Sequence, residues 1–244
     1  MIDLAGLAAA PELVVALDFD GTLAPIVPVP ADARALPEAV TAINGLAGLP
    51  STTVILMSGR AVADLGAVSG FRPPVRLFGS HGLEPDDGPV PLDDEQRERL
   101  DRLNAQVDAL VDGAEGVRIE RKPAGVAVHV RGAAPEIGAR VLNALRAGPA
   151  AAEGIVSTPG KAVLDLAITE MTKGVALDRI RGDAAVFFAG DDVTDESVFT
   201  RLKPGDVGVK VGDGDTAAAH RVPDPAALAA LLEELGATRG RARK

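Results

Sequence analysis

Short apolar runs alternate with segments of helical periodicity along the first 80 residues. The run at 13–17 has no polar face, which suits a strand buried in a parallel sheet. Apolar residues then recur at helical spacing across 36–47. Strand-like runs follow at 52–57 and 75–78, with a helix expected around 61–68 between them. This order is typical of a parallel, doubly wound α/β sheet of the Rossmann-like kind.

The elements predicted between residues 85 and 168 follow a different order, helix–hairpin–helix–hairpin. Amphipathic helices are expected around 100–111 and 137–145. Each is followed by a β-hairpin, the first over 117–131 and the second over 154–167, with the second turn at 158–160. This order indicates an antiparallel sheet covered by helices. We therefore predict an inserted α+β domain over residues 85–168.

After residue 173 the alternation of helices and strands resumes, with strands at 184–189 and 207–211 and a closing helix at 225–235. We expect the first and third parts of the chain to share one sheet, so that residues 1–84 and 169–244 form the core domain. The tail carries four basic residues, Arg239, Arg241, Arg243 and Lys244. An interaction arm is one interpretation, but we expect a frayed, solvated terminus.

The composition excludes several classes of protein. Cys, Trp and Tyr are absent from the 244 residues, which excludes disulfides and leaves no Trp or Tyr to stack on a sugar. The net charge of −10 argues against a nucleic-acid partner. No apolar run approaches the ~20 residues that span a bilayer, and the amino terminus lacks the basic start of a secretory signal. We expect a soluble cytoplasmic protein with no membrane partner.

Two acidic residues directly follow the first apolar run, in the motif DFDGT. If the extended geometry persists, the side chains of Asp18 and Asp20 project to the same side. In an open α/β sheet, ligands bind at the carboxyl ends of the strands. Asp and Gly are also common turn formers after strands, so the motif by itself leaves a structural role open.

A second acidic motif, GDDVTD, follows the later strand at 184–189 and contains Asp191, Asp192 and Asp195. Two acidic strand ends at one edge of a sheet would repel each other unless a cation lies between them. Oxygen ligands with no His or Cys nearby favour Mg²⁺. For Asp192 and Asp195 the alternative is that they only cap the next helix.

Two further signals lie between these motifs. Ser58, Gly59 and Arg60 end the second strand and offer a hydroxyl and a helix N-terminus suited to an anion. Lys173 opens a helix just after the insert, which places a cation near the same edge. Taken singly, Ser58 is typical of a helix cap and Lys173 of a solvated lysine. Their order along the chain, after DFDGT and before GDDVTD, favours a functional role.

This ordered set resembles the haloacid dehalogenase superfamily of Mg²⁺-dependent phosphatases, and the insert stands where that superfamily has its larger type of cap domain. More narrowly, LDFDGTLAPIVPVPADA, MSGR, GSHGLE, ERKPAGVAVHVR and MTKG resemble trehalose-6-phosphate phosphatases. The resemblance covers essentially the whole chain. It implies a phosphorylated disaccharide as substrate and Mg²⁺ as cofactor. A monomer is expected, and an association with the cognate synthase cannot be read from the sequence.

The resemblance also implies roles for the acidic residues. Asp18 would be the nucleophile that attacks phosphorus and becomes an aspartyl phosphate. Asp20 would protonate the departing sugar oxygen and then activate water. Both residues would bind Mg²⁺, Asp20 through its carbonyl, together with Asp191 and with Asp192 or Asp195 in support.

The phosphate-binding residues follow from the same resemblance. Lys173 and the Ser58 hydroxyl would neutralise the charge that develops on the transferring group. Gly21, Thr22 and Gly59 are expected to bind the phosphate as well.

The first hairpin of the insert carries most of the expected substrate ligands. If its loop has two residues, Lys122 faces Gly125 and Arg118 faces His129, which puts polar side chains on one face and apolar side chains on the other. The polar face is either a solvated surface with ordinary ion pairs or, given the resemblance, the surface that recognises a sugar. The expected substrate ligands are Glu120, Lys122, His129 and Asp165 in the insert and Arg60, His81 and Glu84 in the core. For His81 the alternative is a structural hydrogen bond, and for Glu84 it is a position that only marks the domain junction.

Three sites depart from the family pattern. Asp165 stands where a Glu is usual, Ala167 and Ile168 where Arg-Pro is common, and Val130 where an aromatic residue is often found. Asp is one methylene shorter than Glu, so a direct sugar contact could become water-mediated. These differences concern the substrate more than the reaction. The alternatives are a phosphatase for another phosphorylated sugar or pseudo-disaccharide, or a sensor that binds a sugar phosphate without turnover.

Overall fold

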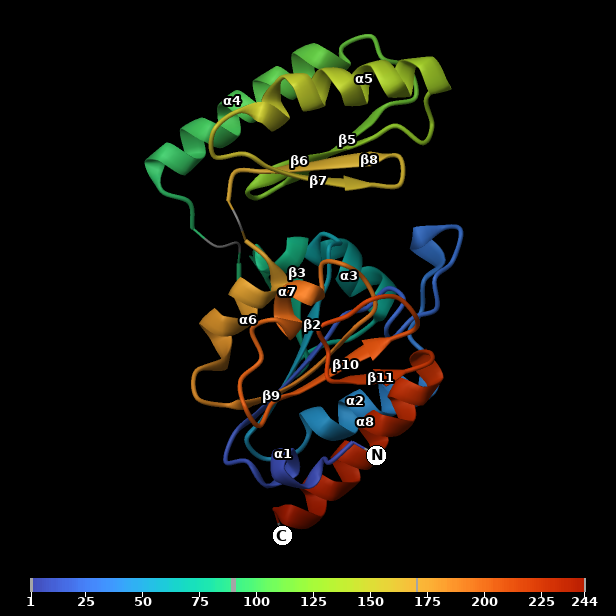
Figure 1. The fold of residues 1–244 in the computed structure, drawn as a ribbon, viewed down its shortest axis with the longest axis vertical. Helices are drawn as coiled ribbons and strands as arrows, with labels where there is room; N and C mark the ends of the chain where they lie inside the picture. Colours follow the sequence, from blue (N-terminus) through green and yellow to red (C-terminus); the bar gives the residue numbers. More distant parts are fainter. Residues whose placement is uncertain (1, 89–90, 170, 244) are drawn as a thin grey trace. The chain divides into compact units, whose positions relative to one another are not determined.

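The computed structural model describes residues 2–88, 91–169 and 171–243 (Figure 1). The chain forms two compact units, one from Met1–Gly88 and Met171–Lys244 and the other from Pro89–Glu170. We call the first unit the core and the second the insert. The chain passes from one unit to the other after residues 88 and 170, within a few residues of the predicted boundaries at 84 and 168. None of the helices in the described part of the chain combines the length and the apolar character needed to span a bilayer.

The core is built on a seven-stranded sheet with the order β11-β10-β9-β1-β2-β3-β4. The described strands pair in parallel except for β4, which is antiparallel to β3. The predicted doubly wound parallel sheet is confirmed. β1 lies between β9 and β2, so the two acidic motifs follow adjacent strands. The strands are β1 (Leu13–Leu17), β2 (Thr52–Met57), β3 (Arg76–Gly79), β4 (Glu84–Pro85), β9 (Ala185–Gly190), β10 (Val207–Val211) and β11 (His220–Val222).

Helices cover both faces of this sheet (Figure 1). Val15 and Leu17 of β1 pack in the cluster that includes α1, α2, α3 and α8, whereas Val14 and Ala16 pack in the cluster that includes α6 and α7. Burial on both faces explains why the run at 13–17 has no polar side. The helices are α1 (Ala5–Ala9), α2 (Pro37–Ala47), α3 (Val62–Ser69), α6 (Lys173–Arg181), α7 (Glu196–Phe199) and α8 (Pro225–Ala242), with 3₁₀ turns η1 (Pro30–Asp32) and η2 (Ser80–Gly82).

The carboxyl-terminal tail is helical and anchored through Arg239, so the prediction of a frayed tail is wrong. The expected solvation holds for Arg241 and Arg243, which are exposed, but not for Arg239. Helix α8 runs to Ala242, beyond the predicted end at 235. Arg239 is completely buried, and its Nε donates to Thr52 Oγ1 at 2.6 Å. Its other donors bind backbone carbonyls at the end of α1 and just before β2. Arg243 donates to carbonyls near the end of α1 as well, and Lys244 lies outside the described residues.

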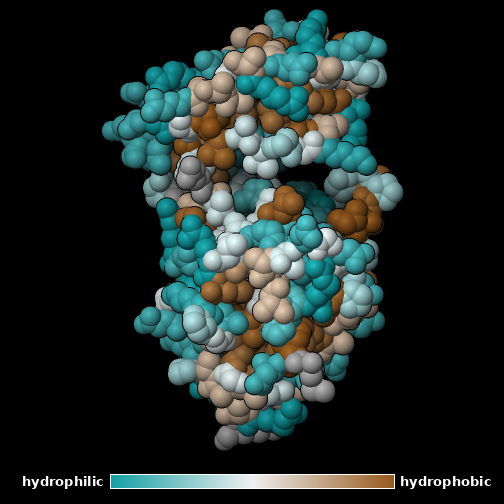
Figure 2. Space-filling model, in the orientation of Figure 1, coloured by the Kyte–Doolittle hydropathy of each residue, from teal (hydrophilic) through white to brown (hydrophobic). Residues whose placement is uncertain are grey.

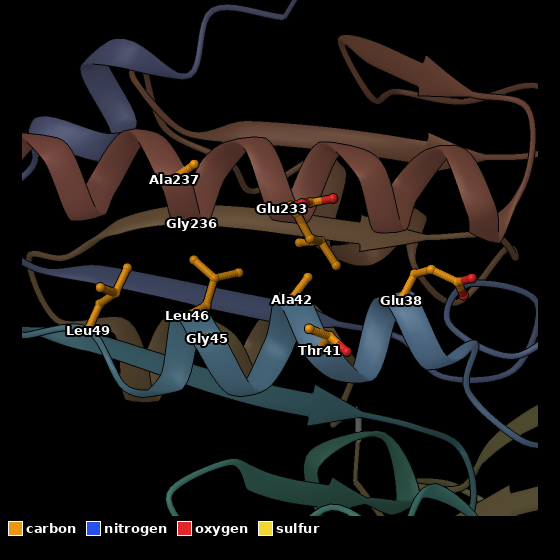
Figure 3. A pocket seen from close by; sticks show the side chains of 10 residues that line it. Glu38, Thr41, Ala42, Gly45, Leu46, Leu49, Glu233, Gly236 and Ala237 are labelled. Carbon is orange, nitrogen blue, oxygen red and sulfur yellow. The ribbon is translucent and has the colours of Figure 1, made fainter.

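Helices α2 and α8 lie side by side, with a groove of about 420 Å³ between them (Figure 3). Small residues such as Gly45 and Gly236 line it, and its acidic residues are Glu38 and Glu233. The groove contains none of the described residues that the sequence predicts for a site. It therefore reflects the small side chains at this helix contact.

The insert is a four-stranded antiparallel sheet, β5-β6-β8-β7, with two helices on one face (Figure 1). Its apolar core joins Leu103 and Val107 of α4, Val141 and Leu145 of α5, and the inward side chains of β6 and β8. The predicted α+β insert is confirmed. On the face shown in Figure 2, hydrophilic side chains gather over α4. The elements are α4 (Asp94–Val111), β5 (Arg118–Lys122), β6 (Gly125–His129), α5 (Pro135–Ala147), η3 (Pro149–Ala151), β7 (Val156–Gly160) and β8 (Val163–Ala167).

The two hairpins of the insert differ in how well the sequence predicts them. In the first, Arg118 pairs with His129 and Lys122 with Gly125, which confirms the predicted two-residue loop. In the second, the predicted turn at 158–160 is wrong, because β7 continues through these residues and the turn falls at 161–162. β7 is an edge strand, where a proline can be accommodated without loss of a ladder hydrogen bond.

Candidate active site

Asp18 and Lys173 form a buried ion pair at the carboxyl end of β1. Asp18 directly follows β1, and Lys173 is the first residue of α6, where the Thr172 side chain caps the helix. The Lys173 Nζ donates to Asp18 Oδ1 at 2.5 Å and to Asp195 Oδ1 at 2.8 Å. One lysine therefore serves two carboxylates that come from different motifs.

Carboxylates from both acidic motifs converge beside this lysine. Asp18, Asp191 and Asp195 each offer one oxygen, and these oxygens lie within 4.8 Å of one another. The Thr22 hydroxyl links the motifs, since its Oγ1 lies 3.0 Å from Asp18 Oδ2 and 3.4 Å from Asp191 Oδ1. The predicted convergence of residues 18 and 191 is thus confirmed.

Burial, and after it the charges of neighbouring groups, shift the pKa values of these acids. Burial raises the pKa of Asp18 to about 6, against the opposing charge of Lys173. Burial and the charge of Asp195 raise the pKa of Asp191 to about 6. Burial and the charge of Asp18 raise the pKa of Asp195 to about 7. At Asp192, burial is outweighed by the charge of Lys173 and by hydrogen bonds, which lower its pKa.

The donor set of this cluster fits a hard divalent cation. Three carboxylate oxygens lie close enough together to share one ion, and no His or Cys belongs to the cluster found among the described residues. Oxygen ligands of this kind are the ones that Mg²⁺ prefers. A cation between the carboxylates would also remove the mutual repulsion that disfavours their charged forms.

Asp192 and Asp195 both organise the loop after β9. Asp192 Oδ1 accepts hydrogen bonds from the backbone and the hydroxyl of Thr194 at 2.8 and 2.7 Å. Asp195 Oδ2 accepts the N–H groups of Asp191 and Asp192 at 3.0 and 3.1 Å. Asp195 also belongs to the carboxylate cluster described above. Loop formation and cation binding are therefore compatible roles for Asp195.

Gly21 allows the two motifs to approach each other. Its φ is +83°, in the left-handed region that glycine adopts without strain. A Cβ at this position would lie 2.0 Å from Asp191 Oδ2. Any other residue would therefore displace the Asp191 carboxylate.

Ser58 and Gly59 join the end of β2 to the segment after β3. Ser58 is buried, and its Oγ accepts the Arg60 N–H at 3.2 Å. Its carbonyl accepts the His81 N–H at 2.9 Å. His81 has a left-handed φ of +57°, and its ring lies so near Gly59 that a Cβ there would be 2.8 Å from Cε1. The predicted sites at Gly59 and His81 are thus packed against each other.

Glu84 caps helix α3. Its Oε2 accepts the Val62 N–H at 2.7 Å, and its Oε1 accepts the Ser80 hydroxyl at 3.0 Å. The alternative that Ser58 caps this helix is wrong. Its hydroxyl accepts the N–H of Arg60, which precedes the first residue of α3. Glu84 is buried, and both of its carboxylate oxygens already accept hydrogen bonds within the core. A role as a substrate ligand would therefore have to be combined with this structural role.

Asp20 is paired with Arg60. The Arg60 Nε donates to Asp20 Oδ2 at 2.6 Å, and Nη2 donates to Oδ1 at 2.7 Å. The Asp20 side chain is 34% exposed and that of Arg60 is 11% exposed. Arg60, an expected substrate ligand, is thus engaged with the expected acid–base residue.

In the insert, the predicted polar residues form two adjacent pairs on one face of the sheet. Glu120 and Asp165 both align with Ala127, so their side chains share a face. Lys122 donates to Asp165, and its side chain is 8% exposed. The His129 Nε2 lies 2.9 Å from Glu120 Oε2.

Sequence reasoning missed one buried lysine near the carboxylate cluster. Lys210 lies in β10, and its Nζ donates to the backbone carbonyl of Asp191 and is 4.0 Å from Glu196 Oε1. It therefore helps to hold the loop that carries Asp191. The signal was a lone lysine within the apolar strand VGVKV, where a charge is costly unless it has a partner.

Residues 16–225 match the family model for trehalose-phosphatase. This chain belongs to the trehalose-phosphatase family. The family resemblance drawn from the motifs is therefore confirmed, and the matched range includes every residue predicted for the site.

Named proteins with similar sequences are consistent with this trehalose-phosphatase family membership. A trehalose-phosphate phosphatase of Mycobacterium avium is 34% identical over 240 residues, covering 89% of this chain and 60% of that protein. A bifunctional trehalose-6-phosphate synthase/phosphatase of Thermoproteus tenax is 34% identical over 230 residues, covering 90% of this chain and 31% of that protein. The chain thus spans less than two thirds of the length of these relatives.

A solved structure of Aspergillus fumigatus trehalose-6-phosphate phosphatase has a similar fold. The TM-score is 0.68 at 26% identity, covering 97% of this chain and 98% of that one. The similarity therefore includes both the core and the insert.

Proposed function

We propose that this trehalose-phosphatase family member is a Mg²⁺-dependent phosphatase that hydrolyses trehalose 6-phosphate to trehalose and phosphate. One observation carries the proposal: the buried Asp18 carboxylate accepts a hydrogen bond from Lys173 and has an oxygen within 4.8 Å of an oxygen of Asp191. This arrangement supports a nucleophile beside a cation site. The names of the relatives support the choice of sugar. We expect the protein to act as a cytoplasmic monomer.

The first step transfers the phosphoryl group to the protein. An oxygen of the Asp18 carboxylate attacks phosphorus, and the bond between phosphorus and the sugar oxygen breaks. Asp20, in its protonated form, gives its proton to that oxygen, so that the sugar leaves as a neutral alcohol. The product on the protein is an aspartyl phosphate at Asp18.

The second step regenerates Asp18. The oxygen of a water molecule attacks phosphorus, one proton of that water passes to the Asp20 carboxylate, and the bond between phosphorus and Asp18 breaks. Inorganic phosphate and the Asp18 carboxylate are restored. In both steps, we expect charge on the phosphoryl oxygens to be offset by hydrogen-bond donors near the end of β1. These donors would be Lys173, the Ser58 hydroxyl and the backbone amides of Gly21, Thr22 and Gly59. In the structure the Gly21 N–H donates to the Ala24 carbonyl at 2.7 Å, a bond that a phosphate would replace.

The carboxylate cluster would hold the metal ion. When bound, Mg²⁺ would supply positive charge that offsets the charges of the nucleophile and of the phosphoryl oxygens. Asp18, the carbonyl of Asp20 and Asp191 would hold it, with Asp192 or Asp195 in support. The closeness of three carboxylate oxygens and the raised pKa values of their groups support this assignment.

We propose that the polar face of the insert recognises the sugar. Glu120, Lys122, His129 and Asp165 present carboxylate, ammonium and imidazole groups, which suit a polyhydroxylated ligand. Their pairing keeps these groups in place on β5, β6 and β8. His81 and Glu84 in the core are further candidate ligands, and Glu84 would keep its contacts to Val62 and Ser80 in that role.

The test is phosphate release from a panel of sugar phosphates, with Mg²⁺ and with a chelator. Trehalose 6-phosphate should be hydrolysed in Mg²⁺ and should exceed glucose 6-phosphate and other disaccharide phosphates in kcat/KM. Equal kcat/KM across the panel would point to a general sugar phosphatase. Binding of trehalose 6-phosphate without phosphate release from any member would indicate a sensor, which is the second class of function.

A further inference from the structure

The two acidic residues of DFDGT have different partners. Asp18 is buried beside Lys173, whereas Asp20 faces the guanidinium of Arg60. The Asp20 contact is bidentate, since Nε and Nη2 each reach a different carboxylate oxygen at 2.6 and 2.7 Å. Such a pair fixes the plane of the carboxylate as well as its position, because both oxygens are held by one rigid fork.

Arg60 is itself held by other groups. Its Nη1 donates to Asp64 Oδ2 at 2.7 Å, and its Nη2 also donates to the carbonyl of Pro30 at 2.8 Å. The guanidinium carbon lies 5.9 Å from the centre of the Phe19 ring. The backbone is fixed as well, since the carbonyl of Arg60 accepts the Ser80 N–H at 2.7 Å. The fork that holds Asp20 is therefore preorganised.

These contacts leave little of Arg60 for a ligand. A guanidinium has five N–H donors. Asp20, Asp64 and Pro30 account for four hydrogen bonds from them. A sugar hydroxyl could take the Nε or Nη2 donors only by displacing Asp20 or Pro30. The contacts thus favour an action on Asp20 over direct recognition of a substrate.

We propose that Arg60 is a positioning residue that fixes the Asp20 carboxylate for the attack of water on the aspartyl phosphate. This inference rests on the proposed two-step phosphatase reaction. The fork occupies one side of each Asp20 oxygen and leaves the other lone pairs free. Those lone pairs can accept the proton of the attacking water, which moves to Asp20 as the bond between phosphorus and Asp18 breaks. Arg60 takes no proton in this step.

The test separates the two half-reactions with 4-nitrophenyl phosphate. Its leaving group departs as a stable anion, so the first step needs little help from Asp20. We expect Arg60→Met to give a burst approaching one nitrophenolate per protein, followed by turnover at least ~10-fold slower than wild type, because general base catalysis contributes about 10²- to 10⁴-fold. Wild type should show no burst. Arg60→Lys should fall between them, because an ammonium cannot hold both oxygens at once.

Asp64→Asn is the matched control, because it removes the charge of the other carboxylate partner of Arg60, keeps an amide oxygen that Nη1 can bind, and leaves the contact with Asp20 in place. It should show no burst. Acid quenching with a radiolabelled substrate measures the accumulated aspartyl phosphate directly, as label bound to the protein. This measurement works for any phosphate ester that the protein hydrolyses. Adding Asp18→Asn to Arg60→Met should remove both the burst and the label. Thermal unfolding of each variant identifies any loss of fold, and Arg60→Lys carries the test if Arg60→Met does not fold.

Three outcomes would overturn the inference. Arg60 variants could show no burst and no retained label while KM for trehalose 6-phosphate alone rises, which would make Arg60 a sugar ligand. Asp64→Asn could match Arg60→Met, which would make the effect a general disturbance of the loop. Arg60→Met and Arg60→Lys could both turn over like wild type. Failure of the proposed function looks different, because wild type would then release no phosphate from trehalose 6-phosphate, or a folded Asp18→Asn protein would release it as fast as wild type.

Discussion

Lys173 donates to Asp18 and Asp195 at once, with the Nζ 2.5 and 2.8 Å from their Oδ1 atoms. The three side chains are almost fully buried, with exposed fractions of 2% for Lys173, 7% for Asp18 and none for Asp195. The charges of the two acids raise the pKa of Lys173 although its burial acts in the opposite direction. The lysine therefore stays charged and stabilises two acids that would otherwise repel each other.

Replacing Lys173 should cost both stability and rate. Lys173→Met keeps most of the side-chain volume but leaves two buried carboxylates without a counter-charge. We expect the free energy of unfolding to fall by about 3–5 kcal/mol, as for other broken buried ion pairs. Phosphate release should fall at least ~100-fold, which is typical when a group that stabilises transition-state charge is lost. Urea unfolding and a phosphate assay measure the two effects.

The control for this change is Lys203→Met, because Lys203 is an exposed lysine of the same core. Its unfolding free energy should stay within about 0.5 kcal/mol of wild type, as is usual for surface substitutions. A Lys173→Met protein as stable and as active as Lys203→Met would contradict the role of the ion pair.

The carboxylate cluster predicts how stability depends on pH when no metal is bound. The pKa values of Asp18, Asp191 and Asp195 are raised from 3.8 to about 6, 6 and 7. Between pH 4 and pH 7 the folded protein binds more protons than the unfolded chain, so its free energy of unfolding falls as the pH rises. The stability that the protonated cluster contributes is therefore fully present below about pH 4 and is lost as the pH rises through 6 to 7. Repulsion in the metal-free cluster should therefore be greatest at pH 8.

Asp191→Asn tests this repulsion. In a chelator, the variant should be more stable than wild type at pH 8, and the difference should shrink at pH 5, where Asp191 of the wild type is mostly protonated. Urea unfolding at the two pH values measures it. Asp213→Asn, at an exposed acid, is the control and should give the same difference at both pH values. Mg²⁺ should stabilise wild type at pH 8 and have less effect on Asp191→Asn. If the stability advantage of Asp191→Asn over wild type were larger at pH 5 than at pH 8, repulsion within the cluster would not explain it.

Gly21 should be far less tolerant of a methyl group than a glycine of similar backbone conformation elsewhere. Gly21 and Gly70 have φ values of +83° and +70°, but a Cβ meets Asp191 Oδ2 at 2.0 Å in the first and nothing within 4 Å in the second. Gly70→Ala should lose about 1–2 kcal/mol of stability from the left-handed backbone alone. Gly21→Ala should lose more and should also weaken Mg²⁺ binding, measured by calorimetry. Equal effects of the two substitutions would show that the close approach is unimportant.

The polar face of the insert predicts a change in substrate preference. Lys122→Met removes the partner of Asp165 and a donor for the sugar. The ratio of kcat/KM for trehalose 6-phosphate to that for 4-nitrophenyl phosphate should fall about 10- to 100-fold, as for the loss of a hydrogen bond to a charged group. Arg121→Met is the matched control, because Arg121 donates instead to Asn104 and Asp108 of α4. An unchanged kcat/KM ratio in Lys122→Met would contradict the proposal that this face recognises the sugar.

The sequence predicts elements whose signal lies within a short stretch of chain. β1 and β9 are apolar runs followed by acids, and their adjacency in the sheet brings Asp18 and Asp191 together. The polar face of the first hairpin follows from the alternation of side chains around its two-residue loop. Such features depend on periodicity and on the rules of parallel sheets, which are readable without coordinates.

The partners of isolated polar side chains could not be predicted in this way. Arg239 lies in a basic tail, but its acceptors come from residues 8–10 and 50–52, far away in the sequence. Glu84 caps a helix that begins 22 residues earlier, and Arg60 lies 40 residues from the Asp20 that it holds. These contacts depend on tertiary packing, which a pattern of residue types does not encode.

The central claim is that Asp18 is the nucleophile at a Mg²⁺-dependent phosphatase site. The most direct test compares phosphate release from trehalose 6-phosphate by wild type and Asp18→Asn, both in saturating Mg²⁺ and both confirmed as folded. We expect rapid release by wild type and no release above background by Asp18→Asn. Release at a similar rate by the folded variant would contradict the claim.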